Sequence, residues 1–217
     1  MSFHKIFTLI SQVSSLFPVI AGLFCFMLLD KKFKILFYFF VSCIFFEIAS
    51  TLMAKWWHNN LPGLHVYTIV EFFAFSNLYY FHFKAKKHLP QIILINSVVF
   101  FIIALADATV LNGIWKFNNY SRPYASLSLV IYAAVYLYYL MKDSYQLHTW
   151  QQPMYWINTG VLLYFGVNLF FFLFSNIIAF HNIQLSTGSL YIHSTINILA
   201  NCLYVQSFIC CYKHKTI

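Results

Sequence analysis

The sequence has very little charge for its length. Only 8% of its 217 residues are Asp, Glu, Lys or Arg, whereas 61% are hydrophobic. A soluble domain of this size needs far more charge to cover its surface, so this composition argues against a water-soluble fold. Apolar runs of about 20 residues, the length that crosses a bilayer, recur along the chain and indicate membrane-spanning helices.

Cysteines are few and badly placed for cross-linking or metal binding. The five are Cys25, Cys43, Cys202, Cys210 and Cys211, all within or at the edge of apolar segments. No C-x-x-C motif occurs, and the predicted outer connections contain no cysteine. A disulfide framework and a cysteine zinc site are therefore not expected.

Seven apolar segments are predicted to be helices. They cover about residues 6–29, 35–54, 64–83, 89–107, 123–141, 153–179 and 189–211. The predicted fold class is therefore all-α, a polytopic membrane protein in which residues 1–217 form a single transmembrane domain of seven helices.

Basic residues are unevenly divided between the two sides of this bundle. The connections after the first, third and fifth segments and the C-terminal tail hold nine: Lys31, Lys32, Lys34, Lys84, Lys86, Lys87, Lys142, Lys213 and Lys215. The other side holds Lys5, Lys55, Lys116 and Arg122. The positive-inside rule predicts an outer N-terminus and a cytoplasmic C-terminus. The net charge of +8 lies in short clusters at helix ends, which indicates contact with membrane lipid and no binding of nucleic acid.

Acidic residues inside the apolar segments are the strongest functional signal. Glu47 and Glu71 are the only glutamates, and each lies about seven residues from the outer end of its segment. Both carboxyls are thus predicted roughly 10 Å below the outer surface, on antiparallel neighbouring helices. An ionisable group at such a depth is costly and indicates a functional site. We expect each to be protonated and hydrogen-bonded, or paired with His65, His193 or Arg122.

Other polar residues are predicted at the same level. His193, Asn197 and Asn201 recur every four residues, so they share one helix face, and Asn168 lies on the preceding segment. These groups predict a polar cavity that opens outward. The structural alternative is that the amides and hydroxyls only join helices, each bond contributing about 0.6 kcal/mol.

The predicted function is that of a ligand-binding or sensory module, with Glu47, Glu71, His65, Asn168, His193, Asn197 and Arg122 as ligand-binding residues. Two acids, neutral amides and aromatic walls suit a small polar or amphiphilic ligand that enters from outside. The short inner connections hold no output domain, so a cytoplasmic or membrane protein partner is expected. No catalytic residue is indicated, and the composition favours a bacterial cytoplasmic membrane.

One alternative is a metal-dependent membrane hydrolase of lipids. The alkaline ceramidases and related seven-helix hydrolases have a late H-x-x-x-H motif, where this chain has His193-x-x-x-Asn197. The second late metal ligand is missing. Two histidines and two glutamates remain as potential zinc or iron ligands, without the spacing of a known motif, so no cofactor is assigned.

A second alternative is a transporter of small solutes or one coupled to protons. The seven-helix sugar transporters share the predicted N-out arrangement, but the two halves of this chain show no matching repeat. The run Tyr155-Trp156-Ile157-Asn158-Thr159-Gly160, followed by Asn168, resembles stretches in uncharacterised small seven-helix bacterial membrane proteins. This resemblance implies no activity.

Overall fold

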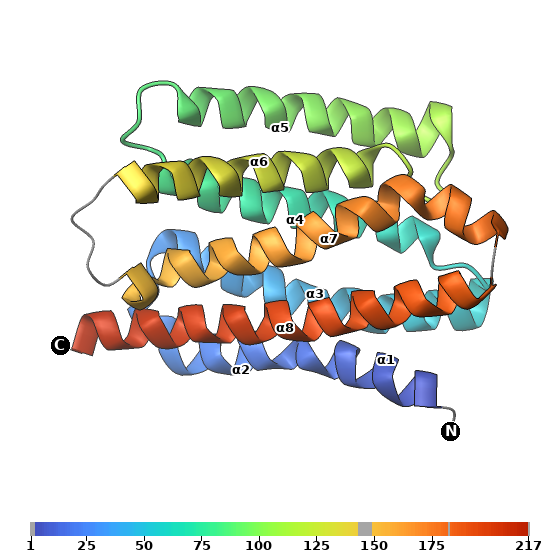
Figure 1. Cartoon of the computed structure of the whole chain (residues 1–217), viewed down its shortest axis with the longest axis horizontal. Coiled ribbons are helices and arrows are strands. Elements are labelled where there is room, and N and C mark those ends of the chain that lie inside the picture. Colours follow the sequence, from blue (N-terminus) through green and yellow to red (C-terminus); the bar gives the residue numbers. More distant parts are fainter. Residues whose placement is uncertain (1–2, 143–148, 182, 217) are drawn as a thin grey trace. The chain divides into compact units, whose positions relative to one another are not determined.

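The structure is a computed structural model that describes residues 3–142, 149–181 and 183–216. Within these ranges the chain forms helices and short connections and no strand, which confirms the predicted all-α class (Figure 1). The α-helices are α1 (Phe3–Ser14), α2 (Leu16–Cys25), α3 (Lys31–Trp57), α4 (Leu61–His82), α5 (Leu89–Ala106), α6 (Ser121–Lys142), α7 (Pro153–His181) and α8 (Ile183–Thr216). Short 3₁₀ turns cover Phe26–Leu28 (η1) and Thr149–Gln151, and a π turn covers Asp107–Leu111.

Within the described residues, five helical stretches are long and apolar enough to cross a membrane. They are Phe7–Leu28, Lys31–Trp57, Leu89–Leu111, Ser121–Lys142 and Tyr191–Lys213. This indicates an integral membrane protein. The helices α4 and α7 are not in this set, so crossing by all seven predicted segments remains a prediction, as does the N-out orientation.

The first predicted helix is divided at Ser15, and Pro18 supplies the reason. Proline has no N–H, so the carbonyl of Ser14, four residues earlier, has no helical donor there. The chain instead closes tighter contacts: Ser15 N–H donates to the Gln12 carbonyl at 3.2 Å, and Ser14 Oγ donates to the Ser11 carbonyl at 2.6 Å. The bend therefore turns the Ser11–Ser15 stretch into a source of polar groups inside an apolar segment.

The chain forms two compact units, Asp30–Ala125 and the combination of Met1–Leu29 with Ser126–Ile217. We call them the central unit and the terminal unit. In the terminal unit α8 packs against α7 and also against α1 and α2 (Figure 1). The long C-terminal helix is therefore the element around which this unit is built.

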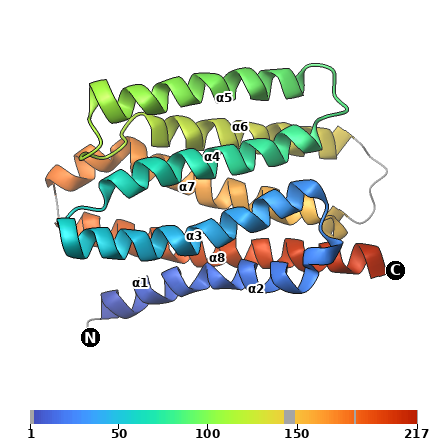
Figure 2. The ribbon, with the colours of Figure 1, turned by 180° about the vertical axis from the view of Figure 1, so that it is seen from behind.

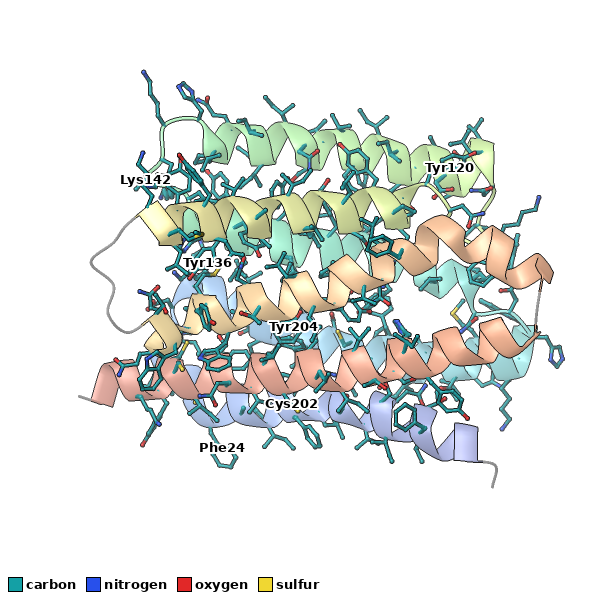
Figure 3. All side chains as sticks on the ribbon, viewed as in Figure 1. Phe24, Tyr120, Tyr136, Lys142, Cys202 and Tyr204 are labelled. Atoms are coloured by element: carbon teal, nitrogen blue, oxygen red, sulfur yellow. The ribbon has the colours of Figure 1, made fainter. Side chains whose placement is uncertain are left out.

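A close approach of α7 and α8 occurs at Gly160. A Cβ at this position would lie 2.6 Å from Cε1 of Tyr204, a ring that is 4% exposed and lies between the two helices (Figure 3). Because the ring is buried, a side chain at residue 160 would have to displace packed atoms of Tyr204.

Replacing Gly160 with Ala is expected to destabilise the protein by about 1–3 kcal/mol, the usual cost of overpacking a filled core. Gly166 offers a matched control in the same helix, because nothing lies within 4 Å of the position that a Cβ would occupy there. Gly166→Ala should instead stabilise by up to about 1 kcal/mol through helix propensity. Unfolding titrations in mixed micelles measure both, and equal effects of the two substitutions would contradict the contact.

In the central unit α4 packs against α3 and α5 (Figure 2). The ring of Phe72 on α4 stacks on Phe100 of α5 at 3.9 Å, and Phe75 meets Phe39 of α3 edge-on at 5.3 Å. All four rings are at most 5% exposed. These aromatic pairs make α4 the buried middle helix of the unit, and it is also the helix that carries Glu71.

The connection of residues 112–120 is tied to the turn between α3 and α4. The Asn59 amide donates to the Trp115 carbonyl at 3.2 Å, and the rings of Trp57 and Trp115 meet edge-on at 6.3 Å. Both indoles are more than half exposed, as expected for aromatic anchors at a membrane–water interface. The start of α4 and the 112–120 connection therefore lie together at one end of the central unit.

Candidate functional site

A buried ion pair joins α4 to the start of α6. Arg122 Nη1 lies 2.8 Å from Glu71 Oε2, and the two side chains are 7% and 3% exposed. The other carboxylate oxygen of Glu71 accepts a hydrogen bond from Tyr67 Oη at 3.0 Å. Tyr67 lies four residues before Glu71, so the helix itself places both groups on one face. Both oxygens of the carboxylate are thus engaged.

The guanidinium of Arg122 contacts several side chains of α4. Its Nη1 also donates to Thr68 Oγ1 at 3.2 Å, and its centre lies 5.4 Å from the centroid of the Tyr67 ring, within the range of a cation–π contact. Thr68 Oγ1 accepts a second bond from Asn118 at 2.7 Å and donates to the Leu64 carbonyl. The charge of Arg122 is therefore balanced by the Glu71 carboxylate, and the Thr68 hydroxyl and the Tyr67 ring also contact the guanidinium.

His65, on the same helix as Glu71, contacts the backbone of the 112–120 connection. Its Nε2 lies 2.9 Å from the carbonyl oxygen of Lys116, and the side chain is buried. A carbonyl only accepts, so Nε2 carries the hydrogen. His65 therefore belongs to the same end of the central unit as Glu71, and its contact is with backbone.

Glu47 lies on α3, the helix packed beside α4. Its backbone carbonyl accepts a hydrogen bond from Thr51 at 2.9 Å, and its side chain is half-buried. Cys43, one turn earlier on α3, lies within electrostatic range of both Glu47 and Glu71 and also interacts with Tyr67. The α3–α4 pair thus carries two carboxyls, those of Glu47 and Glu71, and the guanidinium of Arg122 from α6 contacts the second.

The remaining predicted residues lie in the terminal unit. His193 Nδ1 is 2.7 Å from Asn168 Oδ1, and the Tyr164 ring lies 5.9 Å from the imidazole. Asn168 is fully buried, and its Nδ2 has no hydrogen-bond partner among the described residues. This polar contact joins α7 to α8 and leaves one buried donor unsatisfied.

Two asparagines on one face of α8, Asn197 and Asn201, join that helix to α1. Asn197 donates to the Ser11 carbonyl at 3.2 Å and lies 3.1 Å from Ser11 Oγ. One turn on, Asn201 donates to Ser14 Oγ at 2.8 Å. The two amides therefore form hydrogen bonds between helices, as expected if their role is to join α8 to α1. These bonds lie near the break in the first helix that Pro18 causes.

The seven predicted ligand-binding residues thus fall into two groups. Glu47, His65, Glu71 and Arg122 belong to the central unit, where Glu71 and Arg122 are in direct contact. Asn168, His193 and Asn197 belong to the terminal unit, where Asn168 and His193 are in direct contact. A single pocket lined by all seven remains a prediction.

Asp107 is a further buried carboxylate, and no pattern in the sequence singled it out. Its Oδ2 accepts bonds from Tyr120 N–H at 3.2 Å, Ser121 N–H at 2.9 Å and Ser121 Oγ at 2.8 Å, and its Oδ1 accepts one from Asn112 at 2.6 Å. The side chain is fully buried. Asp107 therefore satisfies the first amides of α6 and positions the helix start on which Arg122 lies.

The part of the chain that the structure describes contains no group of three or more His, Cys, Asp and Glu side chains close enough to hold a metal ion. Comparison with known proteins assigns no function to this chain, since no model of a protein family, no curated protein and no solved structure matches it.

Proposed function

We propose that this protein is a ligand-binding or sensory module of a bacterial cytoplasmic membrane. In this proposal seven helices cross the bilayer with the N-terminus outside, and a small polar or amphiphilic ligand enters from the outer side. The buried Glu71–Arg122 pair is the observation that carries the proposal. A protein partner on the cytoplasmic side or in the membrane receives the signal.

The energetics of the ion pair favour a functional role. Removing two charges from water costs several kcal/mol per ion in real proteins, and apolar residues of similar volume often serve stability as well or better. A pair kept at this cost inside a membrane protein is therefore a candidate for recognition or switching. Arg122 and Glu71 also join different helices, so breaking their contact would free the start of α6 to move against α4.

The charge balance indicates which chemical group would bind. With both carboxyls ionised, Glu47 and Glu71 contribute two negative charges and Arg122 one positive charge, so the set of three carries one net negative charge. A ligand with an ammonium or hydroxyl group complements this set better than a carboxylate does. The aromatic rings of Phe46 and Tyr67, 5.6 Å apart, offer an apolar wall beside it.

A thermal-shift experiment on purified protein tests this assignment. Octylamine, octanol and octanoate share one apolar chain and differ in the head group. Octylamine is expected to raise the melting temperature, because a ligand at 100 times its Kd stabilises a protein by about 2.7 kcal/mol. Octanoate is not expected to raise it. Glu47→Gln should abolish this shift, because it removes one of the two carboxylates and leaves the Glu71–Arg122 pair intact.

Asp30→Asn is the matched control, because Asp30 is an exposed carboxylate between η1 and α3. It should leave the octylamine shift unchanged. Equal shifts from octylamine and octanoate, or a shift that survives Glu47→Gln, would contradict the proposed site. Glu47-dependent uptake of the amine into liposomes would redirect the proposal from sensing to transport.

A further inference from the structure

An apolar groove runs along the surface of the terminal unit between α2 and α8. Its volume is about 790 Å³, and its walls extend from Phe17 to Cys25 on α2 and from Cys202 to Tyr212 on α8. Phe24, which is 83% exposed, projects from α2 at one edge (Figure 3). Because the walls come from two helices, an occupant would be contacted on two sides.

The length of the groove matches one leaflet of a membrane. Ten residues separate Cys202 from Tyr212 on α8, which corresponds to about 15 Å of helix. The hydrocarbon core of a bilayer is about 30 Å thick, so one leaflet contributes about half of that. Both α8 and the α1–α2 segment are among the stretches apolar enough to cross a membrane. A chain of lipid carbons lying along the helices would therefore fit the groove end to end.

One end of the groove is polar and basic. Tyr212 is 48% exposed there and Lys213 follows it at the surface. The C-terminal sequence adds Lys215, and the distribution of lysines predicts that this end faces the cytoplasm. The cytoplasmic leaflet is rich in anionic lipid, to which each nearby lysine adds attraction.

We propose that the groove binds one acyl chain of an anionic phospholipid of the cytoplasmic leaflet. The chain lies between α2 and α8, and the phosphate lies beside Lys213. The apolar walls supply affinity, and the lysine supplies the preference for a negative head group. This site lies within the terminal unit and does not depend on the proposed role of Glu71 and Arg122.

Native mass spectrometry on the full chain, with phosphatidylglycerol or phosphatidylcholine of identical acyl chains added, tests the proposal. The wild-type protein should retain one phosphatidylglycerol per chain. Ala21→Trp fills the groove and should lower the bound fraction about tenfold, the factor for losing contact with some two methylenes. Lys213→Gln should lower the ratio of bound phosphatidylglycerol to phosphatidylcholine about fivefold, with the apolar walls still occupied.

Val98→Trp is the matched control, because Val98 is 61% exposed on α5 of the central unit and does not line the groove. It should bind lipid like the wild type, and the helical content of each variant is checked by circular dichroism. Undiminished binding by Ala21→Trp, or equal retention of the two lipids by the wild type, would overturn the proposal. A dimer that Ala21→Trp dissolves would also overturn it, since the groove would then hold a second copy of the chain.

Discussion

Replacing Glu71 with Gln is expected to lower the free energy of unfolding by about 3–5 kcal/mol. The substitution leaves the shape of the side chain nearly unchanged but removes the carboxylate that is ion-paired with Arg122, a residue only 5% exposed. Arg122→Gln should cost a similar amount, because it strands the carboxylate instead. The large effects arise from the buried charge that remains, and much less from the loss of attraction.

The double variant Glu71→Gln/Arg122→Gln separates these two causes. With both charges gone, no stranded ion remains, so the protein should recover to within about 1–2 kcal/mol of the wild type. Sodium dodecyl sulfate titrations in mixed micelles, followed by circular dichroism, measure all three variants. If the two single losses simply add in the double variant, the pair is not coupled. In that case each residue is held by its other contacts, with Tyr67 and Thr68.

The helical class follows from the sequence because each apolar run has the length of a bilayer crossing. Helix ends are harder to predict. The predicted break over residues 180–188 is helical in the structure apart from residue 182, which is not described, and α8 begins at Ile183. No proline interrupts this stretch, so α7 can run on to His181 and α8 can begin as early as Ile183. At Ser15 a proline does lie three residues on, and the structure has a break.

The position of each site residue along its helix follows from the sequence, whereas its direction around the helix does not. The helices α3, α4 and α8 have no distinct apolar stripe, since apolar residues lie on all sides of them. Counting residues therefore gives the height of Glu47, Glu71 and His193 along their helices and leaves open which neighbours they face. The contacts seen within each unit, Glu71 with Arg122 and Asn168 with His193, therefore could not be chosen from the sequence.

The partner of Glu71 illustrates the same limit, because the sequence offered His65, His193 and Arg122 as partners and the fold selects Arg122. Tyr67 lies one turn away, so its contact could have been found from helical spacing alone. Arg122 lies much farther along the chain, beyond α5 and the 112–120 connection. Its approach depends on how that connection folds back over α4, through bonds such as His65 to the Lys116 carbonyl. These bonds involve backbone groups, which every sequence has and no motif marks.

The same connection makes Asp107 the second residue whose replacement should have a large effect. We expect Asp107→Asn to lower the free energy of unfolding by about 2–4 kcal/mol, because an asparagine turns one acceptor oxygen into a donor. Both oxygens of Asp107 face donors: Oδ2 accepts from Tyr120 N–H, Ser121 N–H and Ser121 Oγ–H, and Oδ1 accepts from the Asn112 amide, so the new NH₂ group meets a donor in either orientation. Hydrogen bonds to a charged group contribute about 1.5–3 kcal/mol each, and a buried donor without an acceptor costs about 1–3 kcal/mol.

Amide hydrogen exchange locates this loss. The N–H groups of Tyr120 and Ser121 should exchange faster in Asp107→Asn, because a neutral amide oxygen is a weaker acceptor than a carboxylate oxygen, while the bonds inside α4 and α5 remain. Asp30→Asn again serves as the control: Asp30 is the exposed N-cap residue of α3, and asparagine caps a helix about as well as aspartate, so stability should change by less than about 0.5 kcal/mol. Equal stability of the two variants, or unchanged exchange at Tyr120 and Ser121, would contradict the capping role. Since Ser121 precedes Arg122, loss of this cap should also loosen the start of α6 and weaken the Glu71–Arg122 contact that the proposed function requires.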